Sequence, residues 1–356
     1  MHIPDGYLSP QTCAIMGAVM VPVMGTAAAK LKKTLKDKQV PLLAIGAAFS
    51  FTIMMYNVPI PDGTSAHAVG ATILAIVLGP WAATVGVSIA LIIQAFFFGD
   101  GGILALGANT FNMAFVIPFV SYYIYKLISG NSEVSSRRRF IGSIIAGYVA
   151  INVSALCVGI ELGLQPLLFH KLDGTPLYAP YNLMQAVPAM MFAHIIVAGP
   201  LEATVTGFVV KYMQKSNPTM LKIYPPKKSE VESLQVIGGL KKYWHVLIAL
   251  IIFAPIGLLT QGNAYGEWSG GELKSKIGFI PEGMAKFSDK WKSVLPDYSV
   301  PGLKGTFFNT SLGYIFCAIV GLVIILTITA IISFLNKRKN TNQNISKIKD
   351  DRVNEK

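Results

Sequence analysis

The chain has 356 residues, of which 53% are hydrophobic and 13% charged, and its net charge is +12. Soluble domains carry about 25% charged residues, so the composition excludes an ordinary soluble protein and predicts an all-α polytopic helical bundle in a membrane. The charge requires no nucleic-acid partner, because the basic residues lie between apolar segments, where anionic membrane lipid would face them.

The chain opens Met1-His2-Ile3-Pro4-Asp5-Gly6, which places a histidine directly after a free amine. The amine of Met1, the backbone nitrogen of His2 and its Nδ1 can close a five-membered and a six-membered ring around one ion. A planar set of nitrogens favours Ni(II) or Cu(II) over Zn(II). Most N-terminal histidines are simply solvated, so other motifs must support this prediction. No cleavable signal is expected, since no basic residue precedes Ser9.

About nine apolar segments are long enough to be considered as transmembrane helices, the third being the shortest. They cover residues 8–29, 40–58, 66–79, 82–98, 106–125, 140–160, 183–211, 243–261 and 309–335. Basic residues concentrate at Lys30 to Lys38, Arg137 to Arg139, Lys211 to Lys242 and after Lys337. Because basic loops stay in the cytoplasm, the N-terminus is predicted outside and the C-terminus in the cytoplasm.

A fourth nitrogen is predicted from His67, which lies at the outer end of an apolar segment, on the same side as Met1. A histidine at a membrane boundary usually bonds to its neighbours, but the shared side with His2 makes His67 the best candidate. His194 and Glu202 are eight residues apart and can share one helix face. For this pair helix packing or partner contact is favoured over metal ligation, and its function stays open.

Three further polar residues are candidates to support the metal ligands. Asp5 can accept hydrogen bonds from backbone donors near the Gly6 turn, or it is a solvated turn residue. Gln94 and Asn109 can position His67, as metal-binding histidines usually require, or they tie helices together. The glycine-rich residues 99–102 either let the backbone approach the site or form an ordinary turn.

Changes in composition divide the chain into four parts. Residues 1–212 form a metal-capturing membrane bundle, 213–242 a basic cytoplasmic linker, 243–335 a two-span part with an external loop at 262–306, and 336–356 a disordered basic cytoplasmic tail. No cofactor is expected apart from the transported ion. The chain has no H-E-x-x-H pair and no phosphate loop, so it is predicted not to be an enzyme, and ATP hydrolysis would require separate subunits.

Several motifs resemble the CbiM/NikM family, the substrate-capture (S) components of energy-coupling-factor (ECF) transporters for nickel and cobalt. They are the first seven residues, the run from His67 to Ala83, the run from Gln94 to Asn109, and Gly199-Pro200-Leu201-Glu202-Ala203-Thr204. Residues 243–335 are similar to the small two-span NikN subunit. Gly266-Glu267-Trp268, Pro281-Glu282-Gly283 and Pro296-Asp297-Tyr298 carry that likeness.

This resemblance implies that Met1, His2 and His67 hold the metal in an outward-facing site. It also implies an ECF transmembrane T component and cytoplasmic ATPase subunits as partners, and a place in the cell membrane of a prokaryote. The alternative is a stand-alone secondary transporter of a divalent transition metal. Such carriers often show inverted repeats, and no convincing repeat is present in this chain. The choice between nickel and cobalt stays open.

Overall fold

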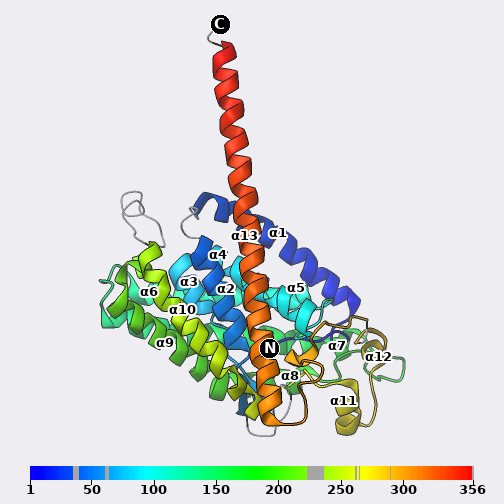
Figure 1. Cartoon of the computed structure of the whole chain (residues 1–356). Helices are drawn as coiled ribbons and strands as arrows, with labels where there is room; N and C mark the ends of the chain where they lie inside the picture. The colour runs from blue at the N-terminus through cyan, green and yellow to red at the C-terminus, as the bar shows by residue number, and fades with distance from the viewer. Residues whose placement is uncertain are drawn as a thin grey trace.

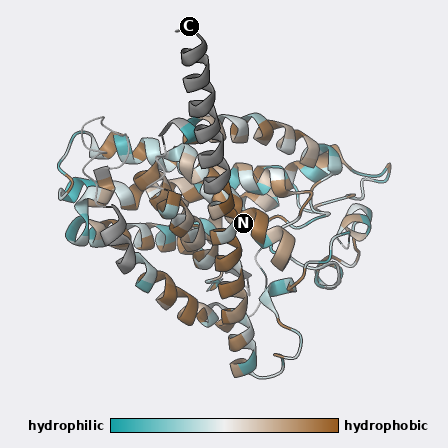
Figure 2. Ribbon diagram, turned by 45° about the horizontal axis from the view of Figure 1, so that its top comes forward, coloured by the Kyte–Doolittle hydropathy of each residue, from teal (hydrophilic) through white to brown (hydrophobic). Residues whose placement is uncertain are grey.

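A computed structural model of the chain describes residues 1–34, 40–60, 64–222, 236–260, 263, 265–288 and 290–354. The described chain is mostly helical, and hydrophobic residues run along its helices (Figures 1 and 2). The helices and strands are α1 (Pro10–Thr34), α2 (Val40–Met54), β1 (Val58–Ile60), β2 (Thr64–Ala66), α3 (Ala71–Leu78), α4 (Pro80–Ile93), η2 (Gln94–Phe98), α5 (Leu106–Asn109), η3 (Thr110–Val116), α6 (Ile117–Ser129), α7 (Arg137–Leu168), α8 (Leu183–Ala193), η4 (His194–Ala198), α9 (Gly199–Ser216), η5 (Pro218–Lys222), α10 (Val236–Phe253), η6 (Ala254–Leu259), α11 (Gly270–Ile277), α12 (Glu282–Phe287), η7 (Pro296–Tyr298) and α13 (Phe307–Asn354).

Six described helical stretches are long and apolar enough to cross a membrane, and two shorter apolar stretches accompany them. The predicted segment at 66–79 differs most from the structure. Its helix, α3, has 8 residues and measures about 12 Å at 1.5 Å per residue, far less than the ~30 Å of a bilayer core. The prediction of a transmembrane helix over 66–79 is therefore wrong. The exact number of crossings and the orientation of the termini stay predictions.

A short hairpin departs from the purely helical prediction. Strands β1 and β2 pair antiparallel, with Val58 opposite Ala66 and Ile60 opposite Thr64. Pro59 and the β-branched residues around it favour extended backbone over helix. The hairpin ends one residue before His67, so it delivers this side chain to the bundle interior.

Close helix packing holds the first part of the chain together. The longest helix of this part, α7, packs against α6, α8 and α9. A Cβ added at Gly163 would lie 2.8 Å from the Cα of Leu183, and one added at Gly107 would lie 2.5 Å from the backbone nitrogen of Gly17. Both glycines are therefore required for close approach of neighbouring backbones. Gly17 on α1 serves packing within the chain, against α5.

The linker predicted at 213–242 is narrower in the structure, because α9 continues to Ser216 and α10 begins at Val236. Residues 223–235 of that linker lie outside the described residues. The tail predicted as disordered at 336–356 continues α13 as helix to Asn354. The helix continues past the predicted boundary because its apolar part has already formed the first helical turns, which are the costly step of helix formation. Each further residue then adds one backbone hydrogen bond. The segment predicted as an external loop at 262–306, named the external loop below after that prediction, contains α11, α12 and η7. Helices α11 and α12 lie beside the bundle (Figure 1).

Candidate metal centre

The first two residues are enclosed by the rest of the chain. Met1 is 4% exposed and His2 3% exposed. The terminal ammonium of Met1 donates to Oε1 of Glu267 at 2.8 Å. The sulfur of Met1 lies 3.6 Å from the Ser154 hydroxyl on α7. The N-terminus is thus fixed from two sides, by the membrane bundle and by the external loop.

Backbone hydrogen bonds hold the following residues in place. Asn109 accepts from the Ile3 nitrogen at 2.8 Å and donates to the Ile3 oxygen at 3.0 Å. Gly102 also donates to the Ile3 oxygen, at 2.8 Å. Asn109 therefore clamps the residue next to His2. Among the described residues, the Asn109 side chain hydrogen-bonds to Ile3 and not to His67. The Ile3 backbone offers one donor and one acceptor, which match the oxygen and the nitrogen of an amide side chain.

Of the two possibilities that the sequence left open for Asp5, the structure has the one with backbone hydrogen bonds. Its carboxylate accepts from the backbone nitrogens of Ile103, Leu104 and Ala105. A Cβ at Gly102 would lie 2.1 Å from Oδ1 of Asp5, so only glycine allows this approach. Burial raises the pKa of Asp5, and the three backbone hydrogen bonds oppose this rise. The carboxylate fixes the loop that follows Asp100 to the N-terminal segment.

The rings of His2 and His67 lie side by side, with centroids 5.0 Å apart. Nδ1 of His67 lies 3.1 Å from the Ala68 carbonyl oxygen, and Nδ1 of His2 lies 3.1 Å from Oδ1 of Asp100. A carbonyl and a carboxylate oxygen only accept, so each Nδ1 carries the proton and each Nε2 keeps its lone pair. Among the described residues both Nε2 atoms are buried without a hydrogen-bond partner.

Both imidazoles are held neutral. Burial and then the nearby terminal ammonium lower the pKa of His2 to about 4. Burial, the ammonium and His2 itself lower the pKa of His67. The contact between His2 and Asp100 is therefore a hydrogen bond from a neutral ring rather than an ion pair. A neutral imidazole with a free lone pair is the form that binds a transition metal.

We expect the metal-free protein to lose stability as the pH falls from about 6.5 to about 4. An unfolded histidine has a pKa near 6.5, whereas the folded His2 takes up its proton near pH 4. The unfolded chain therefore binds more protons in this window, which lowers the free energy of unfolding. Melting temperatures measured in detergent with a chelator present check this. His2→Gln should flatten the decline and His170→Gln, at an exposed position, should not; an equal slope in all three proteins contradicts the argument.

Asp100 joins His2 to the external loop. The Tyr298 hydroxyl donates to Oδ2 of Asp100 at 2.6 Å, and Nε2 of Gln94 donates to the Tyr298 hydroxyl at 2.9 Å. Gln94, predicted as a support for His67, thus contacts Asp100 and Tyr298 instead, because the π-helical turn η2 carries it toward the loop after Phe98. Asp297 and Tyr298 both have positive φ, a strained conformation for residues other than glycine.

Sequence reasoning missed Glu267, Asp100 and Tyr298 as members of this site. Each lies in a quoted motif, but no spacing rule connects the first residue to one 266 positions away. Trp268 belongs to the same set, since its carbonyl oxygen accepts from the Tyr7 hydroxyl at 2.8 Å. The external loop therefore covers the N-terminal segment and supplies charged and polar partners to its first residues.

Glu202 supports the loop that carries His67. Its Oε2 accepts from the backbone nitrogens of Val69 and Gly70, both at 2.9 Å, and the residue is fully buried. These amides are two and three positions after His67, at the start of α3. His194 bonds through Nδ1 to the Met190 oxygen at 2.7 Å, within its own helix. Glu202 thus connects parts of the bundle, in line with the helix packing that the sequence favoured. Its two hydrogen-bond partners lie in the loop that carries His67, a proposed metal ligand.

Glu202→Gln is expected to weaken Ni(II) binding by about 10-fold, the lower end of the range for residues that orient a metal ligand. The amide keeps the shape but accepts two backbone hydrogen bonds more weakly than a carboxylate does. Isothermal titration and the visible ligand-field absorption of bound Ni(II) measure the effect. Glu282→Gln, the same change at an exposed residue paired with Lys171, is the control. Unchanged affinity and spectrum in Glu202→Gln contradict a positioning role.

Within the described residues, no group of three or more His, Cys, Asp and Glu side chains is arranged to hold a metal ion. The cluster described above differs from such a site, because its nitrogens include a terminal amine and a backbone amide. It places an amine, two neutral imidazoles and two carboxylates within one buried region.

Comparison with known proteins places the chain in a family. Residues 2–220 match the model of the CbiM family, the cobalt uptake substrate-specific transmembrane region, and residues 242–338 match the PDGLE domain. The chain belongs to the CbiM family. Members of the CbiM family are known as parts of multi-subunit transport systems.

Relatives of this CbiM-family chain are transport proteins. It is 42% identical to the fused nickel transport protein NikMN of Rhodobacter capsulatus, over 91% of this chain and 95% of that one. It is 41% identical to the "probable fused nickel transport protein LarMN" of Lactiplantibacillus plantarum, over 92% and 95%. A solved structure titled a truncated transition metal transporter is 62% identical, with a TM-score of 0.56, over 60% of this chain and 98% of the other. With its apolar helices, the chain is a multi-pass membrane protein of a prokaryote.

Proposed function

We propose that the chain is the substrate-capture component of an ATP-driven, ECF-type importer of Ni(II) or Co(II). The observation that carries the proposal is the buried cluster of the Met1 amine, His2 and His67, in which the Nε2 lone pair of His67 has no partner among the described residues. A fixed terminal amine beside two neutral imidazoles is a nitrogen-rich site. Such a site suits the later first-row divalent ions.

In the proposed complex, four nitrogens surround the ion: the Met1 amine, the His2 amide nitrogen, His2 Nδ1 and His67 Nε2. The bond from His67 Nδ1 to the Ala68 oxygen fixes the tautomer that leaves Nε2 free, which is the usual support for a metal-binding histidine. A deprotonated amide is a strong in-plane donor. This donor set favours Ni(II) over Co(II).

Metal binding must replace two contacts of the metal-free protein by bonds to the ion. Glu267 holds the Met1 ammonium, and Asp100 holds His2 Nδ1. Each nitrogen has to lose its proton before it can bind the ion, so binding releases protons. His2 must also turn its Nδ1 away from Asp100. The two carboxylates then remain near the ion and offset part of its positive charge.

The energy for import would come from partner proteins. The chain has no phosphate-binding loop with the Walker pattern, so it requires cytoplasmic ATPase subunits and a transmembrane T component. Radioactive nickel uptake into cells that produce this chain, with and without those partners, tests this. We expect uptake only with ATPase subunits whose phosphate-loop lysine is intact. Equal uptake by the chain alone would favour the secondary transporter and overturn the proposal.

A further inference from the structure

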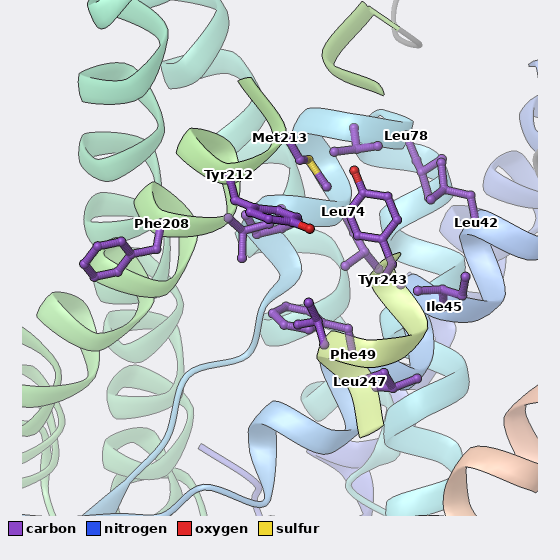
Figure 3. Close-up of a pocket in the computed structure, with 15 residues that line it drawn as sticks. Leu42, Ile45, Phe49, Leu74, Leu78, Phe208, Tyr212, Met213, Tyr243 and Leu247 are labelled. Atoms are coloured by element: carbon purple, nitrogen blue, oxygen red, sulfur yellow. The ribbon is translucent and has the colours of Figure 1, made fainter. Parts of the chain in front are cut away.

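Four helices leave an apolar pocket between them, about 260 Å³ in volume. The lining residues come from α2, α3, α9 and α10, and Figure 3 shows the side chains of Phe49, Leu74, Met213 and Leu247 around one space, with Phe208 at its outer edge. The rings of Tyr212 and Tyr243 also line it and meet edge to face, with centroids 6.4 Å apart. The pocket therefore joins the CbiM part of the chain to its C-terminal part.

The pocket is open on the side where α9 and α10 face outward. Phe208 on α9 is 72% exposed, and Val246 on α10 is 40% exposed. Phe208 lies in a helical stretch long and apolar enough to cross a membrane, and Val246 lies in a shorter apolar one, so the opening is expected to face lipid rather than water. None of the described residues that line the pocket is charged. Its chemistry therefore matches a hydrocarbon chain.

One end of the pocket adjoins the basic segments of the sequence. The lining residues come from the first part of α2, most of α3, the second half of α9 and the middle of α10. Lys215 is exposed and follows Tyr212 by three positions and Phe208 by seven, which places all three on one face of α9. In the sequence Lys242 precedes Val246 by four positions. By the distribution of basic residues, this end faces the cytoplasmic leaflet.

We propose that the pocket holds one acyl chain of an anionic phospholipid, with its phosphate beside Lys215. Basic pockets between transmembrane helices on the cytoplasmic side are a recognised setting for anionic headgroups. The alternative occupant is an apolar partner helix, which would not supply an anionic group for Lys215. The lipid would fill the gap between α9 and α10 and so stabilise the contact between the two parts.

Native mass spectrometry of the full chain tests the proposal, after exchange into detergent with equal amounts of phosphatidylglycerol and phosphatidylcholine. We expect the wild type to retain phosphatidylglycerol preferentially. Val246→Trp should lower retention of both lipids about 10-fold, the effect of lost contact with roughly two methylene groups. Lys215→Glu should lower the preference for phosphatidylglycerol about fivefold, the effect of one lysine near a lipid surface.

Ile248→Trp is the matched control, because Ile248 is 49% exposed on the same helix and does not line the pocket. Its lipid retention should equal that of the wild type. Ni(II) binding by all variants reports intact folding. Equal retention in Val246→Trp and Ile248→Trp would overturn the proposal. It would equally be overturned if Val246→Trp kept its lipid but no longer copurified with the partner membrane subunit, since the pocket would then be a protein-docking surface.

Discussion

A protein with one extra residue ahead of Met1 is expected to lose Ni(II) affinity by more than 100-fold, beyond the roughly 10- to 100-fold effect of residues that only orient a ligand. The extension converts the Met1 amine to an amide and removes both the proposed ligand and the charge that Glu267 binds at 2.8 Å. Met1 is also enclosed, at 4% exposure, so the new residue has no room. Isothermal titration in detergent measures the loss.

The control for this experiment is the same residue added after Lys356, far along the chain from Met1. That protein should bind Ni(II) as the wild type does. Thermal unfolding without metal shows whether the N-terminal extension disturbs folding. Undiminished affinity, with the ligand-field absorption of bound Ni(II) unchanged, would exclude the terminal amine as a ligand.

Replacement of His67 by alanine is the second change with a large expected effect, again more than about 100-fold in Ni(II) affinity. The substitution removes the one proposed ligand that lies outside the first two residues. Only water could take the fourth position, and water is a weaker in-plane donor than imidazole. The ligand-field absorption of any remaining bound Ni(II) should therefore move to longer wavelength, which visible spectroscopy records.

His170→Ala serves as the control, because His170 is exposed and bonds through Nδ1 to the Lys171 oxygen at 2.9 Å. It should keep both the affinity and the spectrum. If His67→Ala retained the wild-type spectrum while binding fell, the fourth ligand would have to be another residue. Asp100, already in contact with His2, would then be the first to examine.

Local sequence patterns predicted the parts of this structure that depend on local physics. Apolar segments of membrane length located most helices. The order Met1-His2 predicts a chelating terminus, and this stays a prediction. The positive φ of Gly6 also followed from local chemistry, whereas the hydrogen-bond partners of Asp5 lie 98 to 100 positions away in the sequence. The hairpin before His67 was missed, because its strands have three residues each and lie between the predicted segments 40–58 and 66–79, where no regular alternation marks them.

Contacts between distant residues could not be predicted in the same way. Asn109 was expected to support His67, yet it clamps Ile3. Glu267 and Tyr298 belong to a polar loop whose composition gives no sign that it folds over the N-terminus. Such pairings depend on how helices and loops pack in three dimensions, which hydrophobic periodicity does not encode. The atom of His2 that bonds to Asp100 is likewise a property of the assembled site.

The contact between Met1 and Glu267 joins the first residue to one 266 positions later. A ribosome that adds 5 to 20 residues per second needs roughly 10 to 50 s to cover that distance. During translation the amino group therefore emerges long before its carboxylate partner exists. In that interval the N-terminus of the nascent chain stays accessible to the enzymes that process it. Only synthesis of the final quarter of the protein supplies Glu267 and the loop that encloses Met1.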